Sequence, residues 1–112
     1  MARHCLALDL INNPTLIAEY EHWHNAENTW PEIKKSILDA GIDQMEIYRT
    51  GNRLFMIMET NESFDPTRKI AMDAANPKVQ QWEQLMWKFQ SSIPWVKEGE
   101  KWVAMNKIFS LV

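Results

Sequence analysis

Apolar residues recur along the chain with two different periods, which separate strand-like from helix-like segments. The run RHCLALDL (residues 3–10) is short and mostly apolar, as expected of a buried strand. DQMEIYRT (43–50) and NRLFMIMET (52–60) are joined at Gly51, and Gly-Asn between two apolar-rich runs is typical of a tight hairpin. KWVAMNKIFSLV (101–112) alternates partially. These four segments predict four strands.

Helical signals fill the connection between the first two strands. Asn13 and Pro14 suit the cap and first position of one helix. A second helical piece is predicted over residues 30–40, because Thr29 and Glu32 have the spacing of a capping box. Gly41 then suits a left-handed C-cap. The first connection is therefore predicted to be two helices with an elbow between them.

The connection after the hairpin is also predicted to be helical. Residues 63–74 form a short helical segment, and residues 76–90 restart the helix with Asn76 as its cap. The second of these segments carries an apolar stripe made of Val79, Trp82, Met86 and Phe89. Residues 91–100 are predicted to be a loop.

The predicted order is β-α-β-β-α-β within one domain, residues 1–112. In so short a chain, this order favours an α+β, ferredoxin-like fold with a four-stranded antiparallel sheet and its helices on one face. The strands carry apolar residues on both sides, including Leu8, Phe55 and Ile57. We therefore expect a second copy of the chain to cover the open face, which gives a homodimer.

Composition narrows the class of protein. The chain has 112 residues, 46% of them hydrophobic, with a net charge of -3. Acidic and basic residues are mixed, so no basic stripe for nucleic acid is present. No apolar run approaches the roughly 18 residues of a membrane span. The single cysteine, Cys5, excludes an intrachain disulfide. We expect a cytoplasmic domain that binds neither nucleic acid nor membrane.

The candidate chemistry centres on the first helix. His24 lies one turn after Tyr20 on the same face, whereas His22 points to the opposite side. Histidine is the side chain best suited to proton transfer near neutral pH, although a surface histidine and a core tyrosine are the simpler interpretations. Residues two apart on a helix do not chelate a metal, and the three glycines are not clustered. We expect neither a metal nor another cofactor.

Six tryptophans in the chain are a high number for its length. Tryptophan serves both cores and the apolar faces of sugars, so Trp30 has either role. Three carboxylates are candidate ligand contacts or bases, namely Asp9, Glu59 and Glu83. Asp9 and Glu59 end apolar strands, where an acid is either a solvated strand end or part of a pocket rim.

Several motifs together resemble one family. EYEHWH followed by WPE, then MEIYRTGNRLFMIME, VQQWEQLM and a late IFSL are similar, in this order, to the L-rhamnose mutarotases, which are small cofactor-free aldose 1-epimerases. The resemblance covers nearly the whole chain. It implies a dimeric, ferredoxin-like α/β barrel.

The resemblance also implies roles for individual residues. The family's proton-donating histidine matches His24, and its sugar-contacting tyrosine matches Tyr20. The first of two adjacent tryptophans beside the sugar matches Trp82, while the second position holds Glu83. Compared with the L-rhamnose enzymes, this chain also has two extra residues between His24 and Trp30. The patterns AENTWPE and LMWKFQ resemble the branch associated with L-fucose.

The resulting hypothesis is an isomerase that interconverts the α and β pyranose anomers of L-fucose or L-rhamnose by general acid–base ring opening. His24 would donate a proton to the ring oxygen, while Tyr20, a carboxylate or water handles the anomeric hydroxyl. Trp82 and Trp30 would hold the apolar face of the sugar, with contacts from Glu83, Asp9 and Glu59. The alternatives are a cofactor-independent monooxygenase on the same fold and a non-catalytic sugar-binding module.

Overall fold

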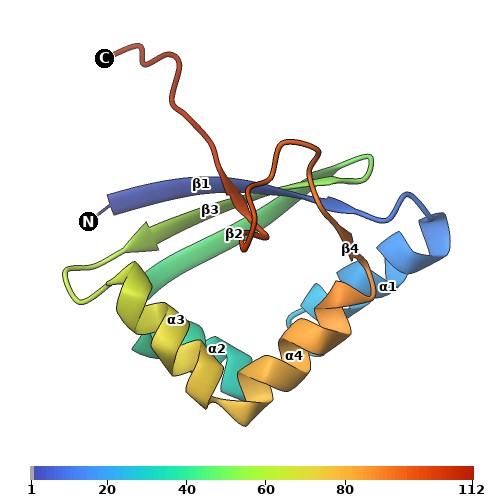
Figure 1. The fold of residues 1–112 in the computed structure, drawn as a ribbon, viewed down its shortest axis with the longest axis horizontal. Coiled ribbons are helices and arrows are strands. Elements are labelled where there is room, and N and C mark those ends of the chain that lie inside the picture. Colours follow the sequence, from blue (N-terminus) through green and yellow to red (C-terminus); the bar gives the residue numbers. More distant parts are fainter. Residues whose placement is uncertain (1) are drawn as a thin grey trace.

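The computed structural model describes residues 2–112, and in it a curved antiparallel sheet carries all four helices on one face (Figure 1). In chain order, the elements are β1 (Ala2–Leu10), α1 (Pro14–His24), α2 (Pro31–Asp39), β2 (Ile42–Thr50), β3 (Arg53–Thr60), α3 (Pro66–Ala75), α4 (Pro77–Trp87), β4 (Gln90–Ser91) and β5 (Val103–Ala104). The predicted α+β class and the ferredoxin-like order are confirmed.

The sheet order is β2-β3-β1-β4, and β5 also pairs with β1. The hairpin turns at Gly51, whose positive φ of 54° allows the tight reversal. Leu8 lies opposite Leu54, and Ala7 lies opposite Phe55. Because side chains alternate along a strand, Leu8 and Leu54 face the helices, whereas Ala7 and Phe55 face away.

The helix starts follow the local signals in the sequence. The Asn13 side chain accepts hydrogen bonds from the backbone N–H groups of Thr15 and Leu16, and a proline follows each cap. Asn76 caps α4 in the same way. The predicted capping box at Thr29 is wrong. The Thr29 hydroxyl instead donates to the Trp23 carbonyl at 2.8 Å, because the elbow turns this side chain back toward the end of α1.

The main core lies between the helices and the sheet. Tyr20 of α1 and Ile33 of α2 pack there with the predicted stripe of α4. That stripe is buried at all four of its positions, which are Val79, Trp82, Met86 and Phe89. The helices therefore bury their apolar faces against one side of the sheet.

The predicted last strand over residues 101–112 is mostly wrong. Only Val103–Ala104 is a strand, and β4 occupies part of the same edge of β1. The chain then runs away from the sheet to its C-terminus (Figure 1). Ile108 and Phe109 are 95% and 75% exposed. The physical reason is that an edge strand needs an apolar surface to pack on, and a single chain offers these side chains none.

Candidate active site

A cavity of about 900 Å³ lies on the helix-covered side of the sheet. Its volume is typical of sites that bind small molecules. The sheet contributes apolar side chains to its lining, namely Leu6, Ile47, Met56 and Met58. The helices, β4 and the segment before β5 contribute the polar and aromatic groups, which include Tyr20, His24, Trp82, Glu83, Gln90 and Lys101. An apolar base with a few polar groups is the usual composition of a specific ligand pocket.

His24 is the last residue of α1, and one of its ring nitrogens has a fixed role. Nδ1 lies 2.8 Å from the backbone carbonyl oxygen of Tyr20. A carbonyl oxygen only accepts, so Nδ1 carries the proton and donates it. In the neutral ring, Nε2 therefore keeps a free lone pair. Burial lowers the pKa of His24, and the hydrogen bond to the carbonyl opposes this effect. At neutral pH, the ring is thus a neutral base.

Tyr20 lies beside His24 and is almost fully buried. The two ring centroids are 4.2 Å apart. Burial raises the pKa of Tyr20 to about 12, while a hydrogen bond with the Gln90 side chain works in the opposite direction. The phenol therefore stays protonated throughout the physiological range. The site thus holds a proton acceptor and a proton donor side by side, one helical turn apart as predicted.

Trp82 is the aromatic centre of the site. Its ring centroid lies 5.7 Å from that of His24, at 65°. Trp30 packs against Trp82 at 5.2 Å but does not line the cavity. An edge-to-face cluster of this kind holds its rings rigidly. Trp82 is therefore placed to offer an apolar face to a ligand, with Trp30 behind it as support.

Glu83 and Lys101 both line the cavity, although they come from α4 and from the segment before β5. Burial lowers the pKa of Lys101, and the nearby Glu83 carboxylate partly opposes this shift. A carboxylate accepts hydrogen bonds from hydroxyl groups, and an amine donates to them. The pair supplies both kinds of contact that a polyhydroxylated ligand requires.

Asp9 and Glu59 do not lie at this site. Both side chains are on the opposite face of the sheet, because they alternate with the residues that face the helices. Asp9 forms a two-point ion pair with Arg53, with contacts of 2.7 and 3.2 Å. Glu59 pairs with Arg3 at 3.2 Å. Neither carboxylate lines the cavity.

Gln90, Lys101 and Trp102 also line the cavity, although none of them was predicted to. Gln90 lies beyond the end of α4 at Trp87, so the helical periodicity of that segment does not place it. No local pattern marks Lys101 or Trp102. Their place depends on the pairing of β5 with β1.

Residues 2–112 contain no group of three or more histidine, cysteine, aspartate or glutamate side chains arranged to hold a metal ion. In the same part of the chain, no helix is long and apolar enough to cross a membrane.

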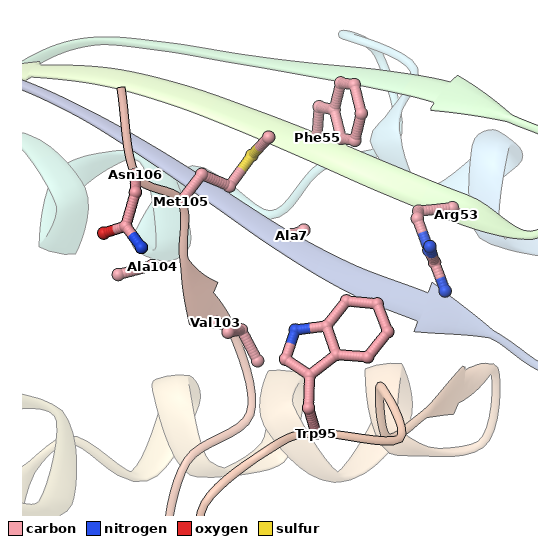
Figure 2. Close-up of a pocket in the computed structure, with 8 residues that line it drawn as sticks. All are labelled: Ala7, Arg53, Phe55, Trp95, Val103, Ala104, Met105 and Asn106. Atoms are coloured by element: carbon pink, nitrogen blue, oxygen red, sulfur yellow. The ribbon is translucent and has the colours of Figure 1, made fainter. Parts of the chain in front are cut away.

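A second, smaller hollow of about 360 Å³ lies on the open face of the sheet. Figure 2 shows the side chains around it, with Arg53 and Phe55 from β3 and Trp95 from the loop after β4. The Arg53 guanidinium lies 5.2 Å from the centre of the Trp95 ring. This hollow has no histidine, tyrosine or carboxylate in its lining. Proton-transfer groups are therefore concentrated in the larger cavity.

Comparison with known proteins agrees with this geometry. The family model for L-rhamnose mutarotase matches residues 3–111. The chain belongs to the L-rhamnose mutarotase family. An L-fucose mutarotase from Xanthomonas campestris is 47% identical over 111 residues, which cover 99% of this chain and 89% of that protein. A UPF0734 protein from Dictyostelium discoideum is 39% identical, with coverage of 94% and 86%.

Two solved structures share the fold of this member of the mutarotase family. The L-rhamnose mutarotase from Formosa agariphila superposes with a TM-score of 0.71 at 19% identity, and each chain is covered completely. The tetracenomycin F2 cyclase from Streptomyces glaucescens, a type-II polyketide cyclase, gives 0.64 at 12% identity, with 98% of each chain covered. At these identities, the likeness establishes the architecture alone.

Proposed function

We propose that this protein is an aldose 1-epimerase that interconverts the α and β pyranose anomers of a 6-deoxy-L-hexose, with L-fucose as its first substrate. The observation that carries the proposal is the pairing of a neutral His24 with a protonated Tyr20 in a cavity of suitable size. Family membership and the 47% identity to an L-fucose mutarotase support it. Glu83 can give the site a preference for one sugar over another, because its carboxylate can accept a hydrogen bond from a particular hydroxyl group.

Anomer exchange needs two proton transfers and no redox step. The anomeric hydroxyl loses a proton while the ring oxygen gains one, and the C1–O5 bond breaks to give the open aldehyde. Rotation about C1–C2 then exposes the other face of the carbonyl to the C5 hydroxyl. Closure reverses both proton transfers and leaves the opposite anomer. A positioned base and a positioned acid accelerate each step.

The tautomer of His24 supports one assignment of these roles. Nε2 has the lone pair, so His24 removes the proton of the anomeric hydroxyl when the ring opens. Tyr20 has a pKa of about 12 and gives its proton to the ring oxygen, because the departing alkoxide is a stronger base than a phenolate. This order reverses the initial hypothesis, in which His24 was the donor to the ring oxygen. On closure, each group returns to its starting state.

The remaining pocket residues fit the two sides of a 6-deoxy sugar. The Trp82 ring offers a surface for C–H groups, and the methionines from the sheet suit the 6-methyl group. Glu83 and Lys101 can hydrogen-bond the hydroxyl groups. Tight binding of a hydroxylated ring needs both kinds of contact, because an unpaired hydroxyl in a pocket is costly.

Saturation-transfer NMR tests the activity directly. One anomeric proton of L-fucose or L-rhamnose is irradiated, and the loss of signal at the other is measured with and without protein. We expect enzyme-dependent exchange, faster for L-fucose. Exchange at the spontaneous rate for both sugars contradicts the proposal. Sugar binding without exchange would instead identify a binding module.

We further propose that the protein is a homodimer joined through the open face of the sheet. That face exposes Tyr48 and Phe55, and the loop after β4 adds Trp95, which is 62% exposed. A contiguous apolar surface of this kind marks an interaction site. The exposed tail beyond β5 carries Ile108 and Phe109 and needs cover as well. In a two-fold dimer, the open face and the tail of each chain can be covered by those of the other chain. Sedimentation equilibrium should give twice the 13.2 kDa of one chain, and a monomer at micromolar concentration contradicts this proposal.

The cytoplasm is the compartment that we propose for this enzyme. Its one cysteine, Cys5, is a free and partly buried thiol in β1, which requires no oxidising environment. Cell fractionation of the native source tests this, and recovery in a secreted or membrane fraction contradicts it.

A further inference from the structure

Gln90 is a buried amide in the lining of the larger cavity. It is the first residue of β4, and its backbone is fixed by pairing with Leu10 of β1. The residue is 8% exposed and shares the cavity lining with Tyr20 and His24. Its position directly after α4 gives it little freedom, because the Ile11 N–H donates to the Phe89 carbonyl at 2.8 Å.

The two ends of this amide are in different situations. Its side chain hydrogen-bonds the Tyr20 hydroxyl, and this bond lowers the pKa of Tyr20. A donor lowers the pKa of a phenol because it stabilises the phenolate, and only the nitrogen of an amide side chain is a donor. Nε2 therefore donates to the Tyr20 oxygen, which leaves the phenolic O–H free to donate elsewhere. The other end is unpaired. Within residues 2–112, Gln90 Oε1 is the one buried side-chain oxygen or nitrogen with no hydrogen-bond partner.

An unpaired buried carbonyl oxygen is unusual in folded proteins, because losing water without gaining a donor is unfavourable. Methionine or leucine at position 90 would fill the space without that cost. Oε1 itself is covered in this structure. The last torsion of a glutamine side chain is soft, so a modest rotation about it can turn Oε1 toward the cavity. A donor in the cavity can then reach it.

We propose that Gln90 is a positioning and specificity-determining residue: its Oε1 accepts a hydrogen bond from one sugar hydroxyl, and its Nε2 holds Tyr20 with the phenolic proton directed at the sugar. This inference rests on the proposed anomer exchange. It gives the enzyme a way to recognise a hydroxyl next to the group that donates the proton. A sugar that lacks that hydroxyl leaves Oε1 unpaired and Tyr20 less well placed.

The proposal is tested by comparing the activity of Gln90 variants on L-fucose with their activity on its deoxy analogues. Gln90→Met keeps the side-chain volume and removes both hydrogen bonds, and Gln90→Glu keeps an acceptor oxygen but removes the amide donor. The exposed Gln81→Met on α4 is the matched control. Anomer exchange is measured for L-fucose and for its 2-, 3- and 4-deoxy analogues by saturation-transfer NMR, together with thermal unfolding of each variant.

For the wild type, we expect one deoxy analogue to show kcat/KM roughly 10- to 100-fold below that of L-fucose. In Gln90→Met, this penalty should vanish, because activity on L-fucose falls to the level of that analogue. The unfolding temperature should stay close to that of the wild type, since the substitution removes an unpaired polar atom together with one hydrogen bond to Tyr20. Gln90→Glu should retain the discrimination with a lower kcat. Gln81→Met should match the wild type throughout.

Two results overturn the assignment while leaving the proposed function intact. One is wild-type activity in Gln90→Met on every sugar. The other is an equal loss on L-fucose and on all three analogues, which indicates general disruption of the site. Failure of the proposed function is recognised separately, because the wild type itself would then exchange no anomer.

Discussion

The two faces of the sheet are built from the same three long strands, yet they differ in what covers them. One face lies under four helices and borders a cavity with His24, Tyr20 and Gln90. The other carries no helix (Figure 1). Two of its carboxylates form ion pairs, Asp9 with Arg53 and Glu59 with Arg3. The cavity on the first face is lined by residues of several helices and strands of one chain. The second leaves apolar surface unpaired, which suits association.

The role of a charged group depends on which face of the sheet it reaches. Asp9 and Glu83 were equivalent candidates in the sequence, but strand alternation directs Asp9 to the open face. Glu83, on α4, lines the cavity. Substitutions on the helix-covered face should therefore change catalysis, and those on the open face should change assembly or stability.

The largest effect is expected from His24→Gln. Loss of the base should lower kcat for anomer exchange by about 100- to 10,000-fold, because a positioned proton-transfer group contributes on that order. Saturation-transfer NMR measures the change. His22→Gln is the matched control, since His22 is exposed on the opposite side of the same helix, and it should keep full activity. Equal exchange by His24→Gln and the wild type would remove His24 from the mechanism.

Phe55→Arg should give the next largest effect, on assembly. The substitution places two guanidinium groups, one from each protomer, at a two-fold apolar interface where burying them is unfavourable, so the dimer dissociation constant should rise by roughly 100-fold or more. Analytical ultracentrifugation over a concentration series measures it. Trp87→Arg is the control, because Trp87 is an exposed aromatic residue on α4, away from this face. An unchanged dissociation constant for Phe55→Arg would place the interface elsewhere.

The pH dependence of kcat/KM should be one-sided. The pKa of His24 lies below its ordinary value of 6.5, so the base stays neutral above that pH and protonates only on further acidification. The rate should fall up to tenfold per pH unit below the lowered pKa. Tyr20 should cause no alkaline decline before its pKa of about 12 is approached. A decline between pH 7 and 9 that persists in Lys101→Met, in which the other titrating amine of the cavity is removed, contradicts the assignment of Tyr20.

The free energy of unfolding should depend on pH through the same residue, His24. Because its pKa is lower in the folded than in the unfolded chain, the unfolded state binds more protons as the pH falls through 6.5. The free energy of unfolding should therefore decrease on acidification in that range. The decrease should be smaller in His24→Gln, which lacks this titrating group. Urea unfolding at several pH values measures the difference.

The smallest effect is expected from Asp9→Asn on the open face. It weakens the two-point contact with Arg53, whose side chain is 40% exposed, so the loss of stability should be about 1 kcal/mol. The kcat for anomer exchange should not change, because Asp9 does not line the cavity. Urea unfolding and NMR exchange measure the two quantities. A large drop in kcat with intact stability would give Asp9 a role in the site that its position does not support.

The sequence by itself determined the features that depend on near neighbours. Asn13 and Asn76 cap their helices through bonds that span two or three residues, and the Gly51 turn sets the hairpin. The pairing of Tyr20 with His24 followed from one helical turn, in the same local way. The resemblance to a family added the chemistry.

Only the tertiary structure decided which distant residues meet. Gln90 and Lys101 reach the cavity because β4 and β5 pair with residues of β1 that lie 80 to 98 positions earlier in the chain. The Met105 N–H still donates to the Cys5 carbonyl of β1, and residues 106–112 after it form no strand, although their alternation predicted one. Periodicity reports which side of an element is apolar. It does not report what that side will pack against, because the partner surface is made only when the sheet and helices come together.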